Sequence, residues 1–181
     1  GNITAREAQN ITPYLTVGEN VIVEGQRKSV SGLSDMSFGN MPVDGGWLLL
    51  SSDKVASLGM SKNDEANFIR RIYGSDEFIR GIVRKCLWIT DDNLPQALEV
   101  DSVRACIDEV REMRLKSKDA GTNQLASRPH QFREMYHGNT HSLILPSVSS
   151  ERREYLPVGL IDARSVVSNL AFAIYDAPLW N

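Results

Sequence analysis

The chain has 181 residues and a mass of 20.2 kDa, and 41% of its residues are hydrophobic, which is enough to bury the core of one ordinary domain. Its net charge of −3 argues against a free-standing, non-specific nucleic-acid binder, because such domains carry a strong basic excess. No apolar run approaches the roughly 18 residues of a membrane span, and no leader-like segment opens the chain. We therefore expect a cytoplasmic protein with no membrane contact.

Two cysteines, Cys86 and Cys106, lie in apolar surroundings along the chain. A cysteine in such a position usually behaves as a small buried hydrophobe rather than as half of a disulfide. The pattern predicts two buried thiols and agrees with a reducing compartment.

The first half of the chain predicts short strands and short helices. Residues 1–10 have weak periodicity and are expected to form a frayed or cloning-derived end. Strands are predicted at Val21–Glu24 and Trp47–Leu50, and a short helix is predicted from Ser52 or Asp53 to Leu58. A further helix is predicted from Asn63 to Gly74, because apolar residues recur there at helical spacing.

The middle of the chain holds the clearest helix signal. A strand rich in β-branched and aromatic residues is predicted at Ile82–Ile89. After it, Asp101 or Ser102 is expected to cap a helix that ends near Lys118, since apolar residues recur every three or four positions.

The last third predicts short strands separated by Gly, Pro, Ser and Asn. The runs QFREMY, HSLILP, YLPVGLI and VSNLAFAIY have this character. Together the segments predict a single α+β domain, with mixed helices in the first two thirds and a small, mainly antiparallel sheet toward the C-terminus.

Several kinds of catalytic or metal site are disfavoured. His137 and His141 have a helical zinc spacing, but Gly138–Asn139 between them predicts a hairpin turn, and no third ligand is evident. No nucleophile elbow and no phosphate-binding glycine motif occurs. The pair Asp91–Asp92 follows a predicted strand, where a loop or helix-starting role is favoured over acid–base chemistry. We therefore assign no catalytic residue and no metal ligand.

The stretch around residues 128–134 suggests a different function. Arg, Gln and Glu side chains can read base edges, Arg at guanine, Gln at adenine and Glu at cytosine, and Arg128, Gln131, Arg133 and Glu134 supply that set. Lys116 and Lys118 belong to a locally basic window in front of it. The cluster SSERR at 149–153 adds hydroxyls and guanidiniums suited to phosphate oxygens.

Longer segments carry a family resemblance. ITPYLTVGENVIVEG, FGNMPVDGGWLLLS, FIRRIYGSDEFI, CLWITDD, REMRLKSKDAGT, RPHQFREM, SLILPSVSSERREYLPVGLI and AFAIYDAPLW occur in this order. From about Ile11 onward the chain resembles the target recognition domain of MmeI-like enzymes. These are large restriction-modification proteins of type IIG or IIL that combine an endonuclease, an adenine-specific DNA methyltransferase and a DNA-reading domain.

The resemblance implies that residues 11–181 are the DNA target recognition domain of a larger chain. The family's S-adenosylmethionine motif and its N-P-P-[YF] motif lie in the methyltransferase core and are absent here; Asp176–Leu179 only faintly imitates the second. The cofactor is therefore expected in the parent protein, which also provides the neighbouring partner domain. The 181-residue chain itself is expected to catalyse nothing, and whether the parent also cleaves DNA is left open.

The resemblance and the residue types together give a set of expected contacts to double-stranded DNA. The set is Arg27, Lys28, Lys116, Lys118, Arg128, His130, Gln131, Arg133, Glu134, Ser149, Ser150, Glu151, Arg152 and Arg153. The expected function is selection of the methylated adenine through sequence-specific base reading. The alternative is a structural protein–protein module that braces neighbouring domains without reading bases.

Overall fold

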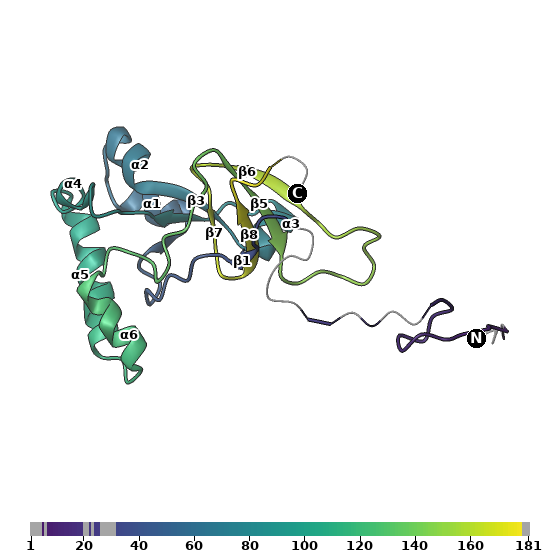
Figure 1. Cartoon of the computed structure of the whole chain (residues 1–181). Helices are drawn as coiled ribbons and strands as arrows, with labels where there is room; N and C mark the ends of the chain where they lie inside the picture. Colours follow the sequence, from purple (N-terminus) through teal and green to yellow (C-terminus); the bar gives the residue numbers. More distant parts are fainter. Residues whose placement is uncertain (1–4, 6, 20–21, 23, 26–31, 179–181) are drawn as a thin grey trace. The chain divides into compact units, whose positions relative to one another are not determined.

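The computed structural model describes residues 5, 7–19, 22, 24–25 and 32–178 (Figure 1). The chain divides into two compact units, Gly1–Leu33 and Ser34–Asn181. In the first unit, the Thr12 N–H donates to the Thr16 carbonyl at 2.8 Å and Ile11 bridges Val17, which closes a tight turn. The strand expected at 21–24 lies partly outside the described residues. No helix among the described residues is long and apolar enough to cross a membrane.

The second unit contains a four-stranded antiparallel sheet with the order β1-β8-β5-β6. Its strands are β1 (Ser37–Phe38), β8 (Ala171–Tyr175), β5 (His141–Pro146) and β6 (Gly159–Asp162). β5 alternates buried and half-buried residues, as a strand with one covered face should. The α+β class and the mainly antiparallel sheet toward the C-terminus are confirmed, whereas β1 was not foreseen.

A second four-stranded sheet has the order β2-β4-β3-β7. It is formed by β2 (Leu49–Leu50), β4 (Lys85–Leu87), β3 (Ile69–Tyr73) and β7 (Val166–Val167), and the β3–β7 pair is parallel. The strands predicted near β2 and β4 are confirmed over fewer residues. The helix expected through Ile72 is wrong beyond Phe68, because Ile69 and Ile72 are buried in a strand between β4 and β7. Tertiary pairing here overrides a helical spacing.

The helices are mostly short. They are α1 (Ser52–Ser57), α2 (Lys62–Phe68), α3 (Ser75–Arg80), α4 (Leu94–Ala97), α5 (Asp101–Leu115) and α6 (Ala120–Gln124), followed by the 3₁₀ turn η1 (Leu125–Ser127). Side chains of Ser51, Ser61 and Asp119 cap α1, α2 and α6 by accepting hydrogen bonds from backbone N–H groups.

The capping expected for the long helix is wrong. α5 is present as predicted, but its N-cap is Val100 and carries no side-chain hydrogen bond. The Ser102 hydroxyl instead donates to the Leu58 carbonyl at 2.6 Å. This contact ties the start of α5 to the end of α1.

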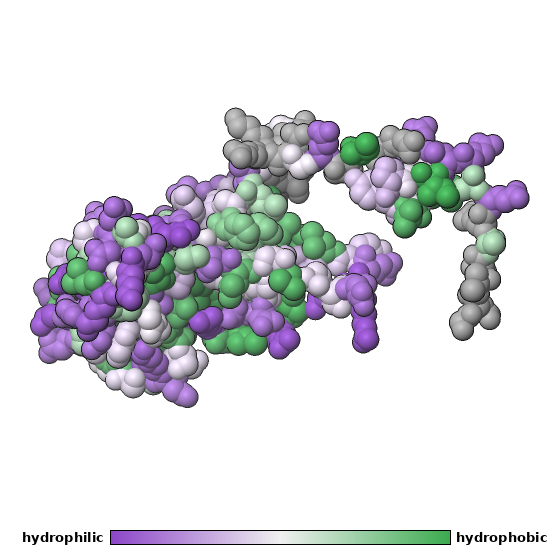
Figure 2. Space-filling model, turned by 90° about the horizontal axis from the view of Figure 1, so that it is seen from below, coloured by the Kyte–Doolittle hydropathy of each residue, from purple (hydrophilic) through white to green (hydrophobic). Residues whose placement is uncertain are grey.

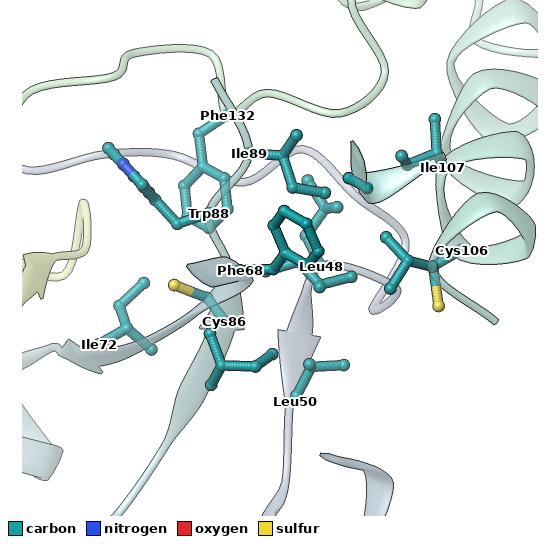
Figure 3. Close-up of a cluster of buried hydrophobic side chains, with 14 of the residues drawn as sticks. Leu48, Leu50, Phe68, Ile72, Cys86, Trp88, Ile89, Cys106, Ile107 and Phe132 are labelled. Carbon is teal, nitrogen blue, oxygen red and sulfur yellow. The ribbon is translucent and has the colours of Figure 1, made fainter. Parts of the chain in front are cut away.

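The larger core packs α5 against the second sheet (Figure 3). Cys106 and Ile107 of α5 meet Leu48 and Phe68, which lie beside the fully buried Trp88. The prediction of two buried thiols is confirmed for Cys86 and Cys106. Burial raises the pKa of the Cys86 thiol to about 12.

A smaller core of Ile144, Ile161, Val167, Ala171 and Ala173 lines the covered face of the first sheet.

The other face of the first sheet is apolar and partly exposed. Directly opposed residues on neighbouring strands share a face. Phe38 pairs with Phe172, which pairs with Leu145, while Leu143 pairs with both Leu160 and Ile174. Phe38 is 57% exposed and Leu160 is 61% exposed. Figure 2 shows hydrophobic side chains gathered over the sheet region, whereas the helical end is mostly hydrophilic. We call these six residues the apolar sheet face.

Candidate nucleic-acid interface

The segment 128–137 follows η1 and has no regular secondary structure. The strand predicted at 131–136 is wrong. Phe132 is fully buried with its ring 5.5 Å from that of Trp88, so the segment is anchored to the larger core by one aromatic side chain. The Arg133 N–H donates to the Met41 carbonyl at 2.8 Å. The segment thus follows the 40–43 loop instead of joining a sheet.

The hairpin expected at Gly138–Asn139 is also wrong, because no strand precedes it. Instead, the carboxylate of Asp176 accepts hydrogen bonds from the backbone N–H groups of Asn139 and Thr140, both at 2.8 Å. These bonds lower the pKa of Asp176 well below its usual range. Asp176 lies in the turn that leaves β8.

Arg114 connects α5 to the segment 128–137. Its side chain is fully buried and each of its five N–H donors is matched to one backbone carbonyl at 2.7–3.0 Å. The acceptors are the carbonyls of Pro42, Val43, Leu125, Arg128 and Gln131. Burial lowers the pKa of this guanidinium to about 10. The sequence signal was a cation four positions after Val110, on the apolar side of the helix, and it was missed.

His130 faces the interior. Only 5% of the residue is exposed, and its Nε2 lies 2.9 Å from Oδ1 of Asp91. Gln131 Nε2 donates to the same oxygen at 3.0 Å. Hydrogen bonds from His130 and then Gln131 lower the pKa of Asp91, while burial lowers the pKa of His130. Asp91 is a loop residue, as expected, and it also holds this segment in place.

Arg128 is used within the segment as well. Its guanidinium donates to Gln131 Oε1 at 3.1 Å, to the Phe132 carbonyl at 2.9 Å and to the Arg133 carbonyl at 2.6 Å. Three of the predicted contact residues, Arg128, His130 and Gln131, therefore support the shape of the segment. Gln131 and Arg128 also line a cavity of about 370 Å³ with Asp91 and His137.

Unlike Arg128, His130 and Gln131, the side chains of Arg133 and Glu134 pair with each other at the surface. Arg133 Nε donates to Glu134 Oε1 at 2.6 Å, and the Met41 N–H donates to Glu134 Oε2 at 3.1 Å. The Arg133 side chain is 53% exposed and that of Glu134 is 21% exposed. Both line an open cavity of about 470 Å³, which we call the Glu134 cavity. Its other walls include Phe38, Met41, Tyr136 and Asn169.

The remaining predicted contacts lie elsewhere in the second unit. Lys116 and Lys118 are exposed at the end of α5, and Lys116 pairs with Glu112. Residues 149–153 are all exposed in the connection between β5 and β6. No hydrogen bond or ion pair between described residues links them to the segment 128–137. Arg27 and Lys28 lie outside the described residues.

The histidines near β5 have structural contacts of their own. His141 Nε2 lies 2.8 Å from the Ala177 carbonyl, and the His137 ring packs edge-on 6.3 Å from that of Trp88. Within the described ranges, no three His, Cys, Asp or Glu side chains gather closely enough to hold a metal ion.

The second unit thus joins a small α+β fold to an open cavity lined by neighbouring hydrogen-bond donors and acceptors. The chain belongs to the family described as "MmeI, target recognition domain", whose model matches residues 17–181. It is 38% identical over 177 residues to DNA methyltransferase A of Bacillus subtilis strain 168, covering 98% of this chain and 20% of that protein.

A solved structure shares the fold. The type IIL restriction-modification enzyme MmeI, determined in complex with DNA, matches with a TM-score of 0.81 and 34% identity over 98% of this chain and 24% of that one. The chain thus spans about a fifth of its curated relative and about a quarter of the solved one. The family resemblance of the sequence is confirmed.

Proposed function

We propose that this domain reads the base sequence of duplex DNA for a restriction-modification methyltransferase that is adenine-specific and uses S-adenosylmethionine. The observation that carries the proposal is the fixed pair Arg133–Glu134 at an open cavity, in a member of the MmeI target recognition domain family. A relative in that family is a DNA methyltransferase, and another was solved with DNA bound.

The geometry of the pair suits base reading. Glu134 is held by two hydrogen bonds, one from Arg133 and one from the Met41 N–H, so its carboxylate is oriented before any ligand arrives. A carboxylate can accept from the amino group of cytosine, while an arginine can donate to guanine. The two Nη atoms of Arg133 have no partner among the described residues and remain available to donate.

Other predicted residues suit contacts with the DNA backbone. Arg152 and Arg153 are exposed on the β5–β6 connection, and Lys118 is exposed after α5. Such cations neutralise phosphates and position a protein without reading sequence. We assign Ser149, Ser150 and Glu151 to the same connection as supporting polar groups. His130, Gln131 and Arg128 act behind the surface by shaping the segment that carries Arg133.

The methyltransferase core of the same polypeptide is the proposed partner domain. It would hold S-adenosylmethionine and the adenine that the enzyme flips out of the duplex, because neither motif needed for that chemistry occurs in this chain. The 181-residue chain is assigned no reaction of its own. A restriction-modification enzyme acts on cellular DNA, which assigns the protein to the cytoplasm.

The test uses the intact methyltransferase that contains this domain. Arg133→Ala and Glu134→Gln should each relax or redirect one position of the methylated sequence, read by sequencing of modified bases in host DNA. Arg80→Ala on α3 is a control that removes an exposed arginine outside the cavity. An unchanged methylated sequence in both cavity variants would contradict the proposal.

Phosphate contacts predict a different response. Arg152→Ala should weaken DNA binding to all sequences alike and reduce the slope of log affinity against log salt concentration by about one. Binding by the intact enzyme across a salt series measures this. If Arg152→Ala instead changed the preference for one DNA sequence over another, Arg152 would contact a base and not a phosphate.

A second function, bracing of a neighbouring domain, is favoured by the apolar sheet face. The part of this face around Leu160, which is exposed and lies opposite Leu143, indicates an interaction site. We infer that it packs on another part of the parent polypeptide. Leu160→Lys should then lower the unfolding temperature of the intact enzyme more than that of the 181-residue chain, whereas equal shifts would contradict packing there.

A further inference from the structure

Three residues of the Glu134 cavity were not among the predicted DNA contacts. Phe38 lies in β1, Asn169 lies in the turn between β7 and β8, and Tyr136 follows the Arg133–Glu134 pair. Phe38 is 57% and Tyr136 is 52% exposed, although large aromatic side chains are usually covered. The fold therefore places two uncovered rings beside the pair.

Asn169 adds an unused amide. Its backbone N–H donates to the Asn40 carbonyl at 3.0 Å, which fixes the position of the residue. No hydrogen bond from any described residue engages its side-chain amide. An amide presented in this way can donate and accept at the same time, as adenine N6 and N7 require.

Backbone packing brings these residues together. Asn40 N–H donates to the Val167 carbonyl at 2.7 Å, and a Cβ on Gly39 would lie 2.4 Å from the same oxygen. Only glycine permits this approach of β1 to β7. Gly39 thereby places Phe38 and the Asn169 turn on the same cavity.

The charge of the cavity selects the class of ligand. Arg133 and Glu134 neutralise one another, and no other charged side chain lines the cavity among the residues that the structure describes. The Glu134 carboxylate would repel the negative charge of a phosphate, whereas it would not repel an uncharged base edge. Aromatic walls add apolar contact, which a thymine methyl group can use.

We propose that the Glu134 cavity also reads an A·T base pair, with the Asn169 amide on the adenine edge and the Phe38 and Tyr136 rings against the thymine methyl. This makes Asn169, Phe38 and Tyr136 further specificity-determining residues. The assignment rests on the proposed function and extends it to a second base pair, next to the one read by Arg133 and Glu134.

The test compares variants of the intact methyltransferase on synthetic duplexes and host DNA. Asn169→Ala should make one A·T position of the methylated sequence degenerate, with discrimination at that position reduced on the order of 10- to 100-fold. Asn63→Ala on α2 removes an equally polar, exposed amide outside the cavity and should leave the methylated DNA sequence unchanged.

A second arm does not depend on the amide. Replacing thymine by uracil at the same position removes only the methyl group and should slow methylation several-fold by the unmodified enzyme, but not by Phe38→Ala. Suppose that Asn169→Ala and Phe38→Ala change neither the discrimination at the A·T position nor the effect of replacing thymine by uracil, while Arg133→Ala alters specificity. The A·T assignment is then wrong, but the proposed base reading by Arg133 is supported. If Arg133→Ala and Glu134→Gln also change nothing, the proposed function itself fails. A change confined to a G·C position overturns the A·T assignment as well.

Discussion

The side-chain amide of Asn40 pairs with both backbone polar groups of Tyr136. Its Nδ2 donates to the Tyr136 carbonyl at 2.9 Å, and its Oδ1 accepts from the Tyr136 N–H at 2.7 Å. Nδ2 also donates to the Val167 carbonyl at 2.9 Å. Asn40 is fully buried. Its side chain therefore satisfies the backbone N–H and carbonyl of Tyr136, as a neighbouring strand would do in a sheet.

Asn40→Leu should destabilise the 181-residue chain. The change leaves the Tyr136 N–H and carbonyl without this partner and removes one of the two hydrogen bonds to the Val167 carbonyl, and an unpaired buried polar group costs about 1–3 kcal/mol. We expect a loss of about 2–4 kcal/mol in the free energy of unfolding, measured by urea denaturation. Asn63→Leu, at an exposed position of α2, should change it by less than about 0.5 kcal/mol. A similar loss in both variants would contradict the role of Asn40.

Arg114 should be equally sensitive. Arg114→Met removes five donors. The Leu125 and Arg128 carbonyls keep a backbone partner, but those of Pro42, Val43 and Gln131 lose this donor, so we expect a loss of about 3 kcal/mol or more. Arg114→Lys should recover only part of it, since an ammonium offers three donors in a different geometry. Arg111→Met, one turn earlier on the exposed side of α5, is the control and should be nearly neutral. Full stability of the lysine variant would refute the five-donor account.

Stability should fall as the pH drops below neutrality because of His130. Burial lowers its folded-state pKa against the opposing contact with Asp91, and Arg114 and Arg128 act in the same direction as burial. The unfolded chain, whose histidines titrate near 6.5, then binds a proton that folded His130 resists. The contribution is present above this unfolded value and is lost as the pH falls through it.

The slope from this group cannot exceed about 1.4 kcal/mol per pH unit. His130→Gln should flatten the dependence of unfolding free energy on pH between about 7 and 5. The exposed His137, changed to Gln, serves as the comparison. An unaltered slope in the His130 variant would show that other groups control acid stability.

The two thiols should be unreactive in the folded chain. Cys86 is fully buried and its pKa is raised to about 12, so at pH 8 its thiolate fraction is on the order of a thousand-fold below that of a free cysteine. Labelling with a thiol reagent at pH 8 should be slow in buffer and complete in denaturant. Rapid labelling of Cys86 in a Cys106→Ala variant, measured in buffer, would contradict this burial.

Much of the fold could be predicted from local patterns. α5 has apolar residues at helical spacing, and β5 alternates along its length, so each segment specifies its own conformation. The helix predicted through Ile72 failed because two apolar residues three apart also fit a buried strand, and only β4 and β7 decide between them. The strand predicted at 131–136 failed because the backbone of this segment forms its hydrogen bonds with loop 40–43 and with the Arg114 side chain, and not with a neighbouring strand.

The sequence by itself determined the family, the amphipathic helix α5, the buried cysteines and the donor and acceptor types around Arg133. These depend on residue identity and on spacing within one segment. Only the tertiary structure decided that His130 faces inward, that Glu134 is held by Met41, and that Phe38 and Asn169 share its cavity. Such contacts join residues far apart in the chain, and local periodicity carries no information about which distant segment will supply the partner.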